Sequence, residues 1–316
     1  MALTIYRDTD SGAPTLPYGS GNLIKVLDAC LRTGYGSKAG AGWTKPYVSG
    51  TTIAAFKQGS GGNGRFVRIW DARTADDPSS YGLTANMRGY ENMTAISTGT
   101  GPFPTTAQES GNGLKLPLSF NGHPNPSKWV VRANSSWFDI RISTGYLAER
   151  VPGVITYDTY FAFGSFFSLK SGDIYNDFIL AQAQANFWPD YPIGAVNYCY
   201  VSRSDTAVIG SVPAILSSTG RLPEDYFGSG HPPDYPYPNR VNNTVALQQY
   251  ILRCDGYDRG VLPGVWTANQ GLTALGWGNT FGGQGSLAGR SFEICPIGFS
   301  SSSGIIFEMS DTFTGI

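Results

Sequence analysis

The sequence predicts a mainly β protein, and three features of its composition support this. Glycine and proline are abundant, at 41 and 20 of 316 residues, and both favour turns over helix interiors. Aromatic residues, which are enriched in strands, make up 13% of the chain. Charged residues make up only 14%, against about 25% in an average soluble protein. We therefore expect a β-sandwich or barrel-like body with one short N-terminal helix, long irregular loops and an extended N-terminal arm.

Residues 1–21 are the predicted extended arm. They mix Asp, Ser, Gly and Pro with isolated apolar residues and lack a helical or strand period. Such a segment needs a surface to pack on, and we expect that surface to be another subunit. The arm's candidate interface residues are Tyr6, Leu16 and Tyr18.

A short helix is expected directly after the arm. Apolar residues recur there at helical spacing, at Leu23, Val26, Leu27, Cys30 and Leu31. Ser20 or Asn22 is placed to cap its start, and Gly34 to end it. The glycine-rich segment 34–42 and the aromatic residues up to Tyr47 then predict a loop pinned by aromatic side chains.

From residue 53 onward the apolar period is two, which is typical of strands. Residues 53–57 and 66–70 flank a glycine-rich turn and predict a β-hairpin. Residues 292–296 and 305–309 flank a glycine and serine turn and predict a second hairpin. Further strands are expected at 83–91, 128–132, 137–142, 154–163, 178–181, 198–201 and 246–253.

Two long stretches predict irregular structure, residues 98–126 and the proline-rich residues 222–239. For the organisation of the chain we expect the arm at 1–21, a helix plus hairpin-rich part at 22–145 and a β-rich part at 146–316. The last two parts are either separate or one continuous body.

Charge and cysteine usage exclude several classes of function. The net charge is -1, so the chain lacks the basic surface that nucleic acids or anionic membranes attract. No segment has the length and apolarity of a membrane span or a secretory signal. The four cysteines have no C-x-x-C spacing and predict buried, reduced side chains, while His123 and His231 each precede a proline. We expect neither a metal nor a cofactor.

No residue pattern predicts an enzyme. The segment at 59–64 matches G-x-G-x-x-G, but a strand follows it where a dinucleotide site needs a helix. Glycoside hydrolysis would require two carboxylates on an aromatic-lined groove. Glu91, Asp139, Glu224 and Asp225 are conceivable members of such a pair, but no spacing selects two of them.

Three aromatic residues lie where no strand is expected to bury them. Tyr235 and Tyr237 belong to the proline-rich stretch, and Trp188 lies in the segment FWPDY. Such side chains face another subunit or a glycan, and we favour the subunit because interface cores are enriched in Tyr and Trp.

Motifs along nearly the whole chain carry a resemblance to a known family. They are GNLIKVLDACL at 21–31, GYGSK at 34–38, AGWTKP at 41–46, FKQG at 56–59, the strand at 65–71, GYENM at 89–93, GTGPFP at 99–104, FAFG at 161–164, KSGD at 170–173, LPGVW at 262–266, GNTF at 278–281, LAGR at 287–290 and FEMSDT at 307–312. With these motifs the chain resembles a family of virion proteins of tailed bacteriophages. The tyrosine and proline stretch around Tyr235 is not part of that pattern.

The resemblance implies a structural component of the virion without catalysis. It would be a head–tail or neck, tail or capsid-surface protein that is made in the bacterial cytoplasm. Its partners would be symmetric copies of itself and other virion proteins, with no nucleic acid or membrane. The alternative is a host-surface or glycan-binding adhesin module of the same particle.

Overall fold

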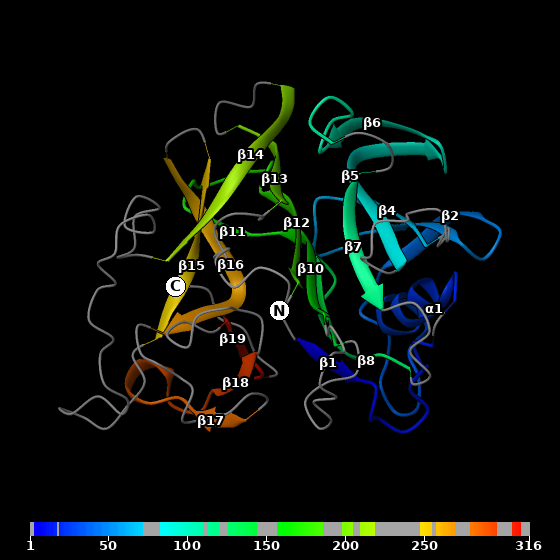
Figure 1. Ribbon diagram of the computed structural model, residues 1–316. Helices are drawn as coiled ribbons and strands as arrows, with labels where there is room; N and C mark the ends of the chain where they lie inside the picture. Colours follow the sequence, from blue (N-terminus) through cyan, green and yellow to red (C-terminus); the bar gives the residue numbers. More distant parts are fainter. Residues whose placement is uncertain are drawn as a thin grey trace.

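A computed structural model of the chain describes residues 3–17, 19–71, 83–109, 113–119, 126–143, 157–185, 198–204, 209–218, 247–254, 257–268, 279–295 and 305–310. Across these residues the protein is mainly β, which confirms the predicted fold class. Its strands form two antiparallel sheets, and one short helix lies beside the smaller sheet (Figure 1).

The smaller sheet has six strands in the order β2-β3-β4-β5-β6, with β7 also paired to β5. The strands are β2 (Thr44–Ser49), β3 (Ile53–Lys57), β4 (Phe66–Trp70), β5 (Leu83–Ala95), β6 (Thr98–Phe103) and β7 (Leu114–Ser119). The long strand β5 pairs with β7 through its first half and with β6 through its second half.

The larger sheet has thirteen strands in the order β1-β8-β9-β10-β12-β13-β14-β15-β16-β19-β18-β17, and β11 pairs with β16. The first strands are β1 (Thr4–Arg7), β8 (Lys128–Ala133), β9 (Trp137–Ser143), β10 (Tyr157–Ser165), β11 (Phe167–Ser168), β12 (Asp177–Ala185) and β13 (Tyr198–Arg203). The last are β14 (Ile209–Ser218), β15 (Leu247–Cys254), β16 (Tyr257–Ala268), β17 (Thr280–Gly282), β18 (Ser291–Cys295) and β19 (Ile305–Glu308), with a 3₁₀ turn η3 (Gly285–Leu287) before β18.

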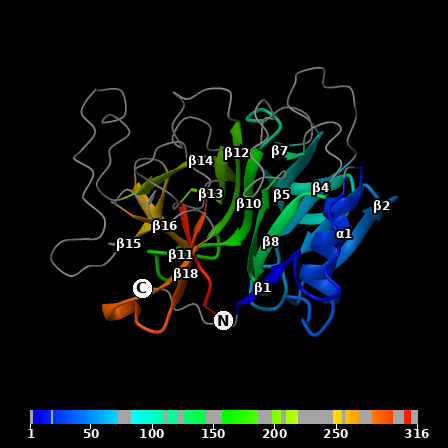
Figure 2. The same cartoon turned by 60° about the horizontal axis from the view of Figure 1, so that its bottom comes forward.

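The strands stack in three layers, since the first half of the larger sheet is buried on both of its faces by other strands. In β10, Phe161 and Phe163 belong to a core shared with the six-stranded sheet and the helix. Tyr160 and Ala162, which point to the opposite face, belong to a core shared with β15, β16 and β19. Strands β8, β9, β10, β12 and β13 thus form a central layer, visible between the other two in both views (Figures 1 and 2). Burial on both faces explains why residues 160–163 are continuously apolar.

The predicted helix is present as α1 (Asn22–Asp28), continued by a π-helical turn η1 (Ala29–Thr33) that ends at Gly34. The predicted N-cap, Ser20 or Asn22, is wrong, because the N-cap residue is Gly21, which has no side chain to bond to the helix. Instead, the Leu23 amide donates a hydrogen bond of 2.8 Å to the carboxylate of the buried Asp71. The carboxylate therefore satisfies an amide at the positive end of the helix.

Both predicted hairpins are confirmed, as β3 with β4 and β18 with β19. The predictions of loops at 44–47 and across 98–126 are wrong where β2, β6 and β7 form. β2 contains Pro46 and lies at an edge of its sheet, where a residue without an amide hydrogen is tolerated. Strands β11, β14, β16 and β17 have no counterpart among the predicted strands, and residues 222–239 lie outside the described residues.

The arm packs on its own chain. Strand β1 pairs with β8 from Thr4↔Ala133 to Arg7↔Val130, and Leu16 bridges to Ser127.

The expected division at 145/146 falls between β9 and β10, which pair over seven residues in one sheet. The central layer therefore continues across that position.

Candidate functional site

Tyr6 and Leu16, two of the predicted interface residues, lie inside the protein. Tyr6 is fully buried, and its hydroxyl donates a hydrogen bond of 2.6 Å to the Ala39 carbonyl. Leu16 is buried in the same core. The expectation that they contact another subunit is corrected, because their own chain already covers them. The other interface candidates, Tyr18, Trp188, Tyr235 and Tyr237, lie outside the described residues, as do Glu224, Asp225 and both histidines.

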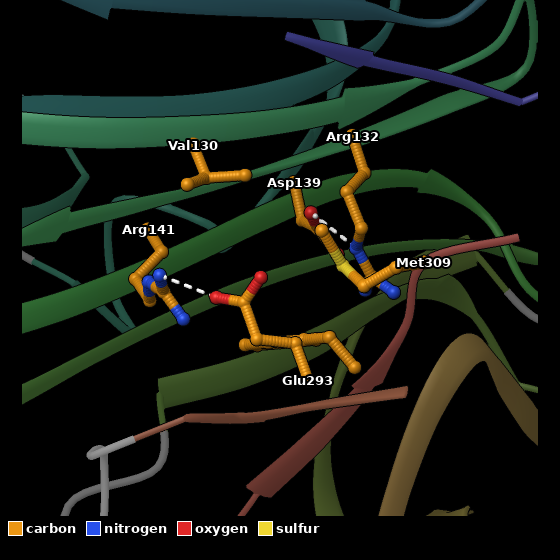
Figure 3. A pocket seen from close by; sticks show the side chains of 7 residues that line it. Val130, Arg132, Asp139, Arg141, Glu293 and Met309 are labelled. Atoms are coloured by element: carbon orange, nitrogen blue, oxygen red, sulfur yellow. Dashed lines mark hydrogen bonds and ion pairs between the residues drawn. The ribbon is translucent and has the colours of Figure 1, made fainter. Parts of the chain in front are cut away.

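A buried ion network joins the central layer to the outer strands (Figure 3). Arg132 of β8 forms an ion pair with Asp139 of β9, to which the Tyr160 hydroxyl also donates at 3.0 Å. Arg132 further donates to the backbone carbonyls of Gly264 at 2.7 Å and Glu308 at 2.9 Å. One guanidinium thus connects β8 and β9 to β16 and β19.

Glu293 of β18 forms the second half of this network (Figure 3). It accepts hydrogen bonds of 2.8 Å from both Arg7 of β1 and Arg141 of β9. Burial alone would raise the pKa of Glu293, but the two arginines hold this pKa below its ordinary value. The cavity beside these groups has a volume of only about 10 Å³, room for about one water molecule. We interpret this network as structural.

The two described carboxylates considered for hydrolysis are each paired with an arginine. Asp139 pairs with Arg132, and Glu91 of β5 pairs with Arg203 of β13. The second pair joins the six-stranded sheet to the central layer.

A second buried carboxylate holds the glycine-rich hairpin loop. Asp177, at the start of β12, accepts hydrogen bonds from Gln58 Nε2 at 3.1 Å, Asn63 Nδ2 at 2.9 Å, Arg65 Nε at 3.0 Å and Ser165 Oγ at 2.9 Å. Three of these donors come from the loop between β3 and β4. Burial raises the pKa of Asp177 above its ordinary value. The loop that matches G-x-G-x-x-G is therefore held in place by hydrogen bonds to the Asp177 carboxylate.

The approach of this loop to the central layer requires glycine at position 59. The Gly59 amide donates to the Ser135 carbonyl at 2.8 Å, and a Cβ atom there would lie 2.3 Å from the Gly42 carbonyl oxygen. Any side chain would push the loop away.

A pocket of about 270 Å³ opens beside this loop. Three chain segments form it: the hairpin loop, the turn before β9, and the segment from the end of β10 to the start of β12. Its wall contains aromatic, amide, hydroxyl and carboxylate side chains, from Gly61, Asn63, Asn134, Ser136, Trp137, Ser165, Phe166, Phe167, Asp173 and Asn176.

The pocket carries little net charge. Its carboxylate, Asp173, forms an ion pair of 2.9 Å with Arg259, and both side chains are almost completely buried. Asp173 also accepts hydrogen bonds from the Ser168 hydroxyl at 2.7 Å and the Tyr175 amide at 3.0 Å. The amide and hydroxyl groups therefore dominate its polar wall.

Exposed apolar side chains gather next to this pocket. Within the described part of the chain, four of the five exposed large hydrophobic residues are Phe167 of β11, Leu169 and Ile174 of the following turn, and Tyr257 of β16. The exposed fractions of Leu169, Ile174 and Tyr257 are 66%, 60% and 69%. Because β11 pairs with β16 and the Leu169 amide donates to the Arg259 carbonyl, these residues lie on adjoining segments. We call these four residues the β11 surface.

Sequence reasoning did not select the pocket or the β11 surface. The turn motif KSGD at 170–173 marked the segment, but nothing in the sequence indicated that it meets residues 61–63 and 134–137.

The cysteine prediction is confirmed for Cys30, Cys199 and Cys254, which are buried and not in disulfides. The described residues contain no cluster of three or more His, Cys, Asp or Glu side chains suited to a metal. In the same part of the chain, no helix has the length and apolarity to cross a membrane.

Comparisons with models of known families, with curated proteins and with solved structures find no match to this chain.

Proposed function

We propose that this chain is a structural subunit of a tailed-bacteriophage particle, located at the head–tail junction or neck, the tail or the capsid surface. It assembles in symmetric copies with itself and with other virion proteins, and it catalyses no reaction. The motifs from residue 21 to residue 312 support the family, and the β11 surface is the structural observation that supports assembly.

The β11 surface suits a subunit contact because the side chains of Leu169, Ile174 and Tyr257 are mostly exposed to solvent. Contiguous exposed apolar groups on a folded protein mark interaction sites. The net charge of -1 also suits an interface stabilised by apolar burial, which salt screens little. A contact of this type can repeat around a symmetry axis.

This surface replaces the N-terminal arm as the proposed contact. The arm's apolar residues lie in the protein's own core, so its strand β1 contributes to the fold of the subunit. The β11 surface, by contrast, needs no rearrangement of the described residues to meet a neighbour.

Purified particles provide the decisive test. Mass spectrometry and negative-stain imaging should find the protein in the particle in a fixed, symmetry-related copy number. The double variant Leu169→Ser, Ile174→Ser should lower its incorporation, whereas Val48→Ser, which changes the exposed valine of β2, should leave incorporation unchanged. Absence of the protein from particles would overturn the proposal, and equal incorporation of both variants would exclude the β11 surface as the contact.

The aromatic residues on which the adhesin alternative rested, Trp188, Tyr235 and Tyr237, lie outside the described residues. A host-surface contact through those residues stays a prediction.

A further inference from the structure

We propose that Asn63 is a site of spontaneous deamidation, and that the carboxylate formed there releases the hairpin loop from the start of β12. The change needs no enzyme, and it does not depend on the proposed assembly role. Three observations carry it: the sequence Asn63-Gly64, the exposure of Asn63, and the hydrogen bonds that its side-chain amide donates to Asn176 and Asp177.

The reaction uses only the chain itself and water. The Gly64 backbone nitrogen attacks Asn63 Cγ, the Cγ–Nδ2 bond breaks, and the departing nitrogen leaves as ammonia with the proton of the Gly64 amide. Because Asn63 is exposed, water reaches the resulting cyclic imide, adds to either of its carbonyls and opens it. The products are aspartate or isoaspartate at position 63, with a water molecule consumed and an ammonia molecule released.

Residue 64 suits the attack because it is glycine. It has no Cβ atom to crowd the approach of its nitrogen to the preceding side chain, and its φ of +74° favours glycine over other residues. Among the described residues, no acceptor of a hydrogen bond from the Gly64 amide would have to be given up. Asn112 and Asn121 precede glycines as well, but they lie outside the described residues.

Two hydrogen bonds control how fast the reaction proceeds in the folded protein. Asn63 Nδ2 donates to Asn176 Oδ1 at 2.8 Å and to Asp177 Oδ2 at 2.9 Å. Nδ2 is the leaving nitrogen, so both bonds are lost in the reaction. Deamidation should therefore be slower in the folded protein than in the unfolded chain, and it should follow the opening of the hairpin loop.

The product removes the contact between the loop and β12. A carboxylate at position 63 has no hydrogen to donate, and it would meet the Asp177 carboxylate as a like charge. Asn176 cannot turn its own amide toward the new charge without losing a bond, because its Nδ2 already donates to the Phe166 carbonyl at 2.6 Å. The new carboxylate also competes with Asp177 for Arg65. Movement of the exposed position 63 into solvent relieves all three conflicts.

Peptide mass spectrometry of the full chain tests whether the reaction occurs. Trypsin cuts after Lys57 and Arg65, and the peptide of residues 58–65 contains Asn63 as its only asparagine. After incubation of the folded protein in mildly alkaline buffer, this peptide should gain the mass difference between a hydroxyl and an amino group, in aspartate and isoaspartate forms. A sample digested at once is the baseline. Asn63→Gln should prevent the gain, because the longer side chain forms a cyclic imide much more slowly.

A third substitution tests the control by the hydrogen bonds. Asn176→Ala removes one of the two acceptors of the Asn63 amide, so it should speed deamidation of the folded protein about fivefold, the effect of losing one hydrogen bond of ordinary strength. In the unfolded chain, Asn176→Ala and the unmodified protein should deamidate at the same rate. An unchanged rate in the folded variant would contradict the control by these bonds.

Two substitutions at position 63 separate the effect of the new charge from the loss of the amide. Asn63→Asp reproduces the product, whereas Asn63→Ala removes the same donors and adds no charge. Tryptic cleavage of the folded protein after Arg65 measures release of the loop. It should be about fivefold faster in Asn63→Asp than in Asn63→Ala, because repulsion by Asp177 raises the population of the open loop. Rates divided by those of the unfolded chains correct for the preference of the protease itself.

The proposal is overturned if the peptide of residues 58–65 gains no mass in the folded protein under conditions in which it does so in the unfolded chain. It is overturned equally if Asn63→Asp and Asn63→Ala are cleaved at the same corrected rate. Circular dichroism of each variant separates local release of the loop from global unfolding.

Discussion

Arg65 Nε donates a hydrogen bond of 3.0 Å to Asp177 Oδ2, and this ion pair crosses from the six-stranded sheet to the central layer. Asp177 is fully buried, whereas Arg65 reaches it from the loop between β3 and β4. The pair therefore fixes the position of one wall of the pocket. Its loss affects both stability and the site beside it.

Replacing Asp177 with alanine should destabilise the protein by about 3–5 kcal/mol, because Arg65 and three neutral donors lose a buried acceptor. Asp177→Asn, which retains the shape and one oxygen acceptor, should lose less. Urea denaturation measures both changes. Asp258→Asn, which alters an exposed pair with Arg253, is the control and should have little effect. Equal stability of Asp177→Ala and the unmodified protein would show that the cluster does not hold the loop.

The Glu293 network predicts a loss of stability in acid. The folded-state pKa of Glu293 lies below the ordinary glutamate value of 4.5, so its stabilising contribution is complete above that pH. The contribution is lost as the pH falls through the folded pKa. Glu293→Gln should cost about 2 kcal/mol at neutral pH, and the difference from the unmodified protein should shrink below pH 4.5. A difference that stays constant down to about pH 2, below the usual range of carboxyl pKa values, would contradict this origin.

Gly164 and Gly172 form a matched pair of left-handed glycines. At Gly164, φ is +137° and a Cβ atom would lie 2.4 Å from both the Ser136 oxygen and the Trp137 Cα. At Gly172, φ is +69° and the space around it is open. Gly164→Ala should cost about 4 kcal/mol or more, whereas Gly172→Ala should cost about 1 kcal/mol through backbone strain alone. Thermal unfolding measures both, and similar losses would contradict the close contact of β10 with the turn before β9.

Leu16 and its neighbour Thr15 test whether the arm belongs to the core. Leu16→Ala should destabilise the isolated protein by about 2–5 kcal/mol, because it leaves a cavity in the core to which Leu16 belongs. Thr15 is exposed, so Thr15→Ala should change the stability little. If both variants unfold at the same denaturant concentration, the arm does not pack on its own chain in solution.

Burial of the thiols predicts slow chemical modification. Burial raises the pKa of Cys30 and Cys199 above the ordinary thiol value, and Cys254 is buried as well. A maleimide reagent at about pH 7, where exposed thiols react through their thiolate fraction, should leave the peptides with these three residues unlabelled in the folded protein. The same peptides should be labelled after denaturation. Rapid labelling of any of the three under native conditions would contradict its burial.

The sequence pattern predicted those elements in which the local preference of the residues matches the structure that tertiary packing requires. The β3–β4 hairpin has alternating apolar residues and a glycine-rich turn, and α1 has apolar residues at helical spacing. Strand β6 contains Gly99, Gly101 and Pro102, which disfavour strands, yet it pairs with β5 because the neighbouring strand supplies its hydrogen bonds. In β6, pairing with the neighbouring strand β5 therefore outweighs the low strand propensity of glycine and proline.

The candidate site could not be predicted for a different reason. Asp177 and its partner Arg65 lie 112 positions apart, and Asn134 belongs to a third segment. No periodicity relates such distant residues, since their meeting depends on the stacking of the three layers. The arm illustrates the same limit, because nothing near β1 in the sequence indicates that β8 is its partner.

The pairing of β1 with β8 also bears on synthesis at the ribosome. Strand β1 leaves the exit tunnel before β8, the strand that pairs with it, which follows about 120 residues later, about 6–24 s at ordinary elongation rates. The ion-pair partner of Arg7, Glu293, is synthesised later still, because it lies 286 positions further along the chain. The nascent protein therefore carries an open strand edge through much of translation, and chaperones that mask such edges are expected to raise the yield of soluble protein.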